Sequence, residues 1–268
     1  MIPQCRAKIF LADDRGHSEM PWFRSYNTFN FGKYNNEYKA AFGSLYVLND
    51  DTLAAGKSLK LSTEENSHIV LIPVVGALAY KDSNDNESLL QAGEAQLCSL
   101  QHGSSITIAN PYEKETINFL QVWIKNSDSL PSGEIHQINF DLNKNNNQLI
   151  PLFKACNHTQ LSIGKYDGRA EDLYKLSNQS NSVFAFVIEG AFEVQNRLLH
   201  ARDGLALWNV QEVEFEALSN EAIILFTEGL STAIKSTPDS SSAEMKATFL
   251  LNRSSFAISK TPFCFLHS

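Results

Sequence analysis

The chain has 268 residues, 43% of them apolar, so it is long enough for two globular domains that each bury a core. Its 30 acidic and 22 basic residues give a formal charge of −8, which repels the phosphates of nucleic acids and anionic lipid headgroups. No stretch approaches the roughly 20 apolar residues of a spanning helix or the apolar core of a signal peptide. These features predict a cytoplasmic protein that binds neither nucleic acid nor membrane directly.

Short apolar segments follow one another along the chain and predict an all-β fold. They are rich in Val, Ile, Phe and Tyr, and Gly, Asn, Asp or Ser residues separate them, as is typical of strands and their turns. The clearest examples cover residues 42–48, 68–75, 118–125, 183–188 and 222–227. Long helical periodicity is absent, so only a few short helices are expected.

A weak internal repeat predicts two similar β domains. The sequence VVGALAY begins at residue 74, and the related sequence IEGAFEV begins at residue 188, which is 114 residues later. In both copies a strand reaches a glycine turn and continues into a second strand. We therefore expect an N-terminal domain over 1–132, a C-terminal domain over 133–232, and a Ser-rich bridge and tail over 233–268.

Several segments of the chain resemble the pirin-like bicupin family in order and spacing. In the N-terminal half they are DRGH at 14–17, SYNTFNFGKY at 25–34, FGSLYVLNDD at 42–51, YKDSNDN at 80–86 and LQVWI at 120–124. The C-terminal half resembles the family through EGAFEV at 189–194 and DGLALWN at 203–209. Five collinear matches in one half are more specific than any single motif.

This resemblance implies a fold, a metal site and an activity. The implied fold is two tandem cupin barrels, each a double-stranded β-helix or jelly roll, with a mononuclear metal site in the first barrel. Family members bind iron or another divalent metal, and they are known as nuclear cofactors in animals and as bacterial proteins with quercetin 2,3-dioxygenase activity. Because one fold carries many functions, the residues at the site have to decide whether this activity is expected here.

Other residues occupy the family's first set of metal-ligand positions in this chain. The first cupin motif is G-x5-H-x-H-x3-E, and counting from Gly56 places Ser62 and Glu64 at the two histidine positions. His68 stands at the glutamate position. If one continuous strand carries all three residues, their side chains face the same way, into the barrel.

The second set of ligand positions is also substituted. The motif G-x2-H-x3-N keeps its Gly103 and Asn110, but Ile106 stands at the histidine position. Ile108 follows at a position that is often a ligating glutamate in the family. Isoleucine has no lone pair to offer a metal, so we predict no catalytic residue, no metal ligand and no bound cofactor at these positions.

Three functional hypotheses remain. In the first, the protein has lost the metal-dependent dioxygenase site and binds a small molecule, or acts in regulation, through a first-barrel pocket lined by Ser62, Glu64, His68, Ile106 and Ile108. In the second, Glu64, His68 and the nearby turn residue His102 form a rearranged metal site in a quercetin 2,3-dioxygenase-like oxidoreductase. In the third, the protein is an interaction module with an unidentified protein partner. The missing ligands favour the first hypothesis and weigh against an enzyme without deciding the question.

Adjacent carboxylates do not suggest an acid–base pair. Asp50 and Asp51, like Glu64 and Glu65, point in opposite directions if they lie on a strand. We interpret these pairs as turn and surface charges. The sequence also lacks a nucleophile elbow, a P-loop and a zinc-protease motif.

Overall fold

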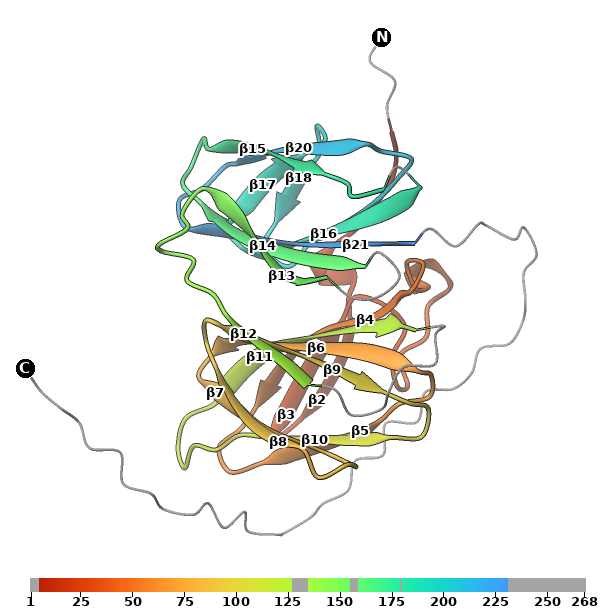
Figure 1. Ribbon diagram of the computed structural model, residues 1–268, viewed down its shortest axis with the longest axis vertical. Helices are drawn as coiled ribbons and strands as arrows, with labels where there is room; N and C mark the ends of the chain where they lie inside the picture. The colour runs from red at the N-terminus through yellow and green to blue at the C-terminus, as the bar shows by residue number, and fades with distance from the viewer. Residues whose placement is uncertain (1–4, 127–134, 155–158, 179, 231–268) are drawn as a thin grey trace, which may run out of the picture.

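The structure, a computed structural model, describes residues 5–126, 135–154, 159–178 and 180–230. It confirms the all-β fold with two barrels stacked in four layers of sheet (Figure 1). The only helical turns among these residues are two short 3₁₀ helices, Ala12–Asp14 and Glu37–Lys39. No helix in this part of the chain is long and apolar enough to cross a membrane. The predicted tail over 233–268 lies outside the described residues.

The first barrel consists of a seven-stranded and a four-stranded sheet. The larger sheet has the order β12 (Ile135–Asn139), β9 (Glu94–Leu100), β6 (Ser67–Val75), β11 (Ile117–Lys125), β4 (Leu45–Leu53), β3 (Phe23–Asn27) and β2 (Gly16–Met20). The smaller sheet has the order β5 (Ser58–Ser62), β10 (Ser105–Ala109), β7 (Ala77–Asp82) and β8 (Glu87–Gln91). The pairings between these strands are antiparallel, for example those of β11 with β4 and β6.

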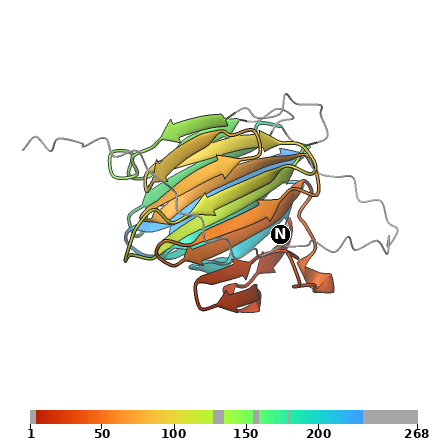
Figure 2. The same ribbon diagram turned by 90° about the horizontal axis from the view of Figure 1, so that it is seen from below.

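The second barrel repeats this plan with a six-stranded and a four-stranded sheet. The larger sheet has the order β1 (Arg6–Phe10), β19 (Gly204–Trp208), β16 (Asn181–Glu189), β21 (Ala222–Leu230), β14 (Gln160–Tyr166) and β13 (Gln148–Lys154). The smaller sheet has the order β15 (Glu171–Lys175), β20 (Glu212–Ala217), β17 (Ala191–Val194) and β18 (Leu198–His200). Seen from below, the strands of the stacked sheets run in similar directions (Figure 2), as in aligned sheet packing.

The two larger sheets pack against each other in the middle of the molecule (Figure 1). Their facing sides form one apolar cluster, in which Leu48, Val70 and Val122 of the first barrel meet Phe184 and Phe186 of the second. Two further clusters fill the interiors of the two barrels. Each larger sheet is therefore buried on both faces. This double burial explains why β6 is a continuous apolar run and shows no polar alternation.

Two strands at the edges of the larger sheets, β1 and β12, join sheets that their place in the chain would not suggest. The N-terminal strand β1 pairs with β19 of the second barrel, with Arg6 opposite Trp208. In the other direction, β12 follows the predicted boundary at residue 132 but pairs with β9 of the first barrel. For these two strands, position along the chain and membership of a sheet differ. β1 therefore connects the N-terminal part of the chain to the second barrel, and β12 extends the larger sheet of the first barrel.

A buried carboxylate links the two barrels. Asp50 lies on β4 and is only 7% exposed. Its Oδ2 accepts hydrogen bonds from Arg15 Nη1 at 3.4 Å and from Arg202 Nε, in the second barrel, at 2.9 Å. Its Oδ1 accepts one from Asn118 Nδ2 at 2.7 Å. The interpretation of Asp50 and Asp51 as surface charges is wrong, because the strand that carries them is buried on both faces.

Replacing Asp50 should loosen the contact between the barrels. Asp50→Ala leaves Arg15 and Arg202 without their shared carboxylate at a mostly buried site, so we expect the free energy of unfolding to fall by about 3 kcal/mol. Chemical denaturation measures this change. The control is Glu87→Ala, which removes an exposed partner of Lys81 and should leave stability nearly unchanged. Equal effects of the two substitutions would contradict the assigned role of Asp50.

Candidate functional site

The strand expected to carry the first set of ligand positions is broken by a turn. β5 ends at Ser62 and β6 begins at Ser67, so the expectation of one continuous strand is wrong. Thr63 holds the turn in place, because its backbone N–H donates to the Ser104 carbonyl at 2.9 Å and its Oγ1 donates to the Gln101 carbonyl at 2.6 Å. The side-chain directions on the two sides of the turn are therefore set independently.

Ser62 lies outside the interior of the first barrel. On β5, Leu59 and Leu61 are the buried side chains that point inward, and Ser62 is exposed. Ser62 pairs across the strands with Ser105. Glu64 lies in the turn and is half-buried. The inward direction expected of Ser62 is therefore not observed.

His68 is buried on the opposite face of its sheet. Its neighbour Ile69 belongs to the core of the first barrel, whereas Val70 belongs to the core between the barrels. Because side chains alternate along a strand, His68 shares the face of Val70. Its Nδ1 lies 2.9 Å from the hydroxyl of Ser99, the residue opposite it on β9. His68 is therefore a buried histidine on the interface side of the sheet.

Ile106 and Ile108 are the two ligand positions that do face the barrel interior. Both are 0% exposed and belong to the first-barrel core. Across the strands, Ile106 lies opposite Leu61 and Ile108 lies opposite Leu59. This wall of the barrel is consequently aliphatic where family members place metal ligands.

Ile108 should behave as a core residue. Ile108→Ala removes a fully buried side chain, and we expect it to lower the free energy of unfolding by about 3 kcal/mol because it leaves a cavity. Thermal or chemical denaturation measures the loss. Ser62→Ala is the matched control at an exposed ligand position, and it should change stability little. A large loss for Ser62→Ala would show that its side chain is not exposed as described.

The residues present do not fit the metal centre that the family implies. Within the described ranges, no three His, Cys, Asp or Glu side chains are grouped so that they could hold a metal ion. The rearranged set of Glu64, His68 and His102 is therefore not assembled. His102 is exposed in a turn, where its backbone N–H donates to Asn66 Oδ1 at 2.9 Å, and His68 faces the other side of the sheet.

A buried polar group on a different wall of the first barrel was missed by sequence reasoning. Trp123 Nε1 donates to Gln121 Oε1 at 3.1 Å, and Gln121 Nε2 donates to Asp51 Oδ2. The pKa of Asp51 is raised to about 7, mainly by burial and also by the charge of Asp50. Hydrogen bonds from Ser25 and Gln121 act in the opposite direction and limit this rise. An available signal was the recurrence of polar residues two apart in β3, with Ser25 and Asn27, and in β4, with Asn49 and Asp51.

Asp51 should give the folded protein a distinctive pH dependence. A folded-state pKa near 7 exceeds the unfolded value of about 3.9, so the native state binds more protons than the unfolded state between these values. We therefore expect stability to fall as pH rises from about 4 to about 7, by on the order of 4 kcal/mol from this group alone. Unfolding of the wild type and of Asp51→Asn should be compared across this range. Parallel stability profiles would contradict the prediction.

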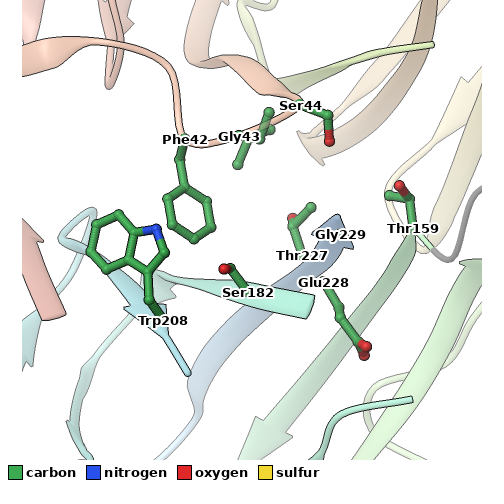
Figure 3. Close-up of a pocket in the computed structure, with 10 residues that line it drawn as sticks. Phe42, Gly43, Ser44, Thr159, Ser182, Trp208, Thr227, Glu228 and Gly229 are labelled. Carbon is green, nitrogen blue, oxygen red and sulfur yellow. The ribbon is translucent and has the colours of Figure 1, made fainter. Parts of the chain in front are cut away.

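A small cavity lies between the barrels, away from the predicted site. It has a volume of about 20 Å³, enough for about one water molecule. Phe42 and Trp208 line one side, with ring centroids 5.0 Å apart, and Ser182 and Thr227 also face the space (Figure 3). Glu228 borders it, but its carboxylate accepts hydrogen bonds from Tyr174, Ser177, Asn178 and Asn181. These contacts identify a structural carboxylate.

Comparison with known families supports the resemblance inferred from the motifs. Residues 11–124 match the family model for pirin, and residues 156–227 match the model for the quercetinase C-terminal cupin domain. A quercetin 2,3-dioxygenase of Escherichia coli K12 is 25% identical over 222 residues, which cover 80% of this chain and 95% of the relative. The pirin-like protein YhaK of the same strain is 32% identical over 119 residues, or 44% of this chain and 50% of that protein.

Solved structures show the same fold. The crystal structure of YhhW from Escherichia coli superposes with a TM-score of 0.75 at 23% identity, covering 83% of this chain and 97% of that chain. A structure of the bacterial pirin YhhW in complex with nickel(II) gives a TM-score of 0.74 at 22% identity, with coverage of 83% and 98%. At these identities the likeness establishes the architecture alone.

Proposed function

The chain belongs to the pirin-like bicupin family, and we propose that it is a member without the family's metal-dependent dioxygenase chemistry, acting instead as a small-molecule-binding or regulatory protein. The observation that carries this proposal is which residues stand at the ligand positions and where their side chains lie. Ile106 and Ile108 occupy the barrel wall, Ser62 is exposed, and His68 lies on the far face of the sheet. An iron or zinc centre needs three or more protein ligands with an open position.

The retained framework supports a binding role for the first barrel. Asn110, which the second cupin motif keeps, donates from Nδ2 to the carbonyls of Leu53 and Glu115 at 2.9 and 2.8 Å. Gly56 and Gly103 keep positive φ angles of 63° and 81° in their turns. The chain thus keeps framework residues of both cupin motifs, while Ser62, Ile106 and Ile108 stand at ligand positions of the motifs. A protein partner is the other kind of ligand that a regulatory member would take.

A second candidate is a quercetin 2,3-dioxygenase-like oxidoreductase with a metal held elsewhere. The observation in its favour is the similarity to relatives named quercetin 2,3-dioxygenase over about four fifths of the chain, 80% for the Escherichia coli protein. Against it stands the absence of a grouped set of metal-binding side chains in the described residues.

Metal content and oxygen consumption distinguish the two candidates. Protein purified without a histidine tag should contain much less than one iron, nickel, copper or zinc per chain, because the ligand positions lack donors. It should consume no oxygen with quercetin, before or after chelation. Glu64→Ala tests the one carboxylate at a ligand position, and Glu65→Ala is its control on the same turn.

Two results would overturn the proposal. Stoichiometric metal and quercetin turnover that are both lost in Glu64→Ala and kept in Glu65→Ala would establish a metal-dependent oxygenase. Turnover that survives chelation would establish an enzyme that needs no metal, and it would equally contradict a purely binding role.

A further inference from the structure

A row of amide side chains crosses the inner face of the first barrel. Gln96 on β9 lies opposite Leu71 on β6, which lies opposite Gln121 on β11. Gln121 in turn lies opposite Asn49 on β4, and Asn49 lies opposite Asn27 on β3. The five positions therefore form one line across the five adjacent strands β9, β6, β11, β4 and β3. We call its four polar members, Asn27, Asn49, Gln96 and Gln121, the amide row.

The amide row is buried within an apolar core. Its members are between 0% and 1% exposed. Leu71, within the line, and Trp123, two residues after Gln121 on the same face, belong to the hydrophobic cluster of the first barrel. Side chains directly opposite each other on paired strands are about 5 Å apart at Cβ, so Asn27, Asn49 and Gln121 are neighbours on this wall.

Some polar atoms of the row are paired with the protein. Asn27 Nδ2 donates to Ser25 Oγ at 2.9 Å. Ser88 Oγ donates to Gln96 Oε1 at 2.5 Å. Gln121 uses both ends of its amide, on Trp123 and Asp51. These bonds hold the side chains in place but consume only part of their hydrogen-bonding capacity.

Four buried atoms of the row have no hydrogen-bond partner among the described residues. They are Asn27 Oδ1, Asn49 Oδ1, Asn49 Nδ2 and Gln96 Nε2. A buried polar atom without a partner costs its full desolvation free energy, and native proteins rarely leave such an atom without a partner from the protein or from ordered solvent. Asn49 is the extreme case, because neither end of its amide is bonded and its side chain is 0% exposed.

The mixture of donors and acceptors among these four atoms indicates which kind of molecule they could bind. Two of them are acceptors and two are donors, so a bare cation would leave the N–H groups unsatisfied and an anion would face carbonyl oxygens. A hydroxyl group both donates and accepts, and it carries no charge that the apolar core would have to bury. From the four unpaired amide atoms lined up on β3, β4 and β9, we propose that this wall is a binding site for uncharged hydroxyl-bearing molecules, either ordered water or a small polyol.

This site deepens the binding function proposed above and lies elsewhere than the family's ligand positions. Ser62, Ile106 and Ile108 lie on β5 and β10, and Glu64 lies in the turn after β5. His68 is on β6 of the seven-stranded sheet but faces the second barrel, whereas the amide row lies on the face of that sheet toward the first-barrel core. The two proposals can fail separately. Metal content and oxygen consumption decide the first, and occupancy of the amide row decides the second.

Occupancy can be measured on the full-length wild-type protein by nuclear magnetic resonance. Oxygen-17 relaxation dispersion detects long-lived internal water, and titration with erythritol, followed through the side-chain amide signals of Asn27 and Asn49, detects an organic guest. Long-lived water that erythritol does not displace identifies water as the guest. A saturable shift of both amide signals identifies a polyol site. Neither long-lived water nor a saturable shift would overturn the proposal.

Asn49→Leu provides an independent test. If a guest satisfies the Asn49 amide, the substitution should abolish the long-lived water or the erythritol shift and should lower the melting temperature. If the amide has no guest, Leu removes an uncompensated polar group from an apolar core and should raise the melting temperature, which would contradict the proposal. Asn139→Leu, at an exposed position on β12 of the same sheet, is the matched control and should leave both NMR readouts at wild-type levels.

Discussion

Burial of the central sheets on both faces is the constraint on which the rest of the structure depends. The seven-stranded sheet closes the first barrel with one face and packs against the second barrel with the other. Each side chain on its inner strands therefore lies in one of two cores. Because side chains alternate between the two faces of a strand, neighbouring residues enter different cores. Asp50 and Asp51 illustrate the consequence. One joins the barrels through two arginines, and the other lies in the interior of the first barrel with a raised pKa.

The same constraint explains where the side chains at the family's ligand positions lie. His68 falls on the interface face because β6 begins after the turn at residues 63–66, so the spacing of the motif no longer sets its direction. Ile106 and Ile108 keep the inward direction, and they extend an aliphatic wall that includes Leu59 and Leu61. The interior of the first barrel still contains polar side chains. They lie on the seven-stranded sheet, where Asp51 and the amide row are surrounded by apolar side chains.

Membership of the pirin-like family and the proposed loss of its chemistry are compatible for a physical reason. Barrel formation depends on apolar faces, turn glycines and groups such as Asn110, all of which are present. Metal chemistry depends on a few side chains that offer lone pairs at defined positions. Such side chains can be replaced by apolar side chains that join the core with little effect on the barrel. Replacing a ligand by isoleucine on an inward-facing strand even adds apolar burial.

The sequence by itself determined the all-β class, the duplication, the family and the chemical identity of each residue at a ligand position, because these depend on local composition and on spacing along the chain. Only the tertiary structure decided which way Ser62 and His68 point, which sheets β1 and β12 join, and that Asn27, Asn49, Gln96 and Gln121 form one line. Strand register joins residues far apart in the chain, and in strands buried on both faces no polar alternation reveals it beforehand.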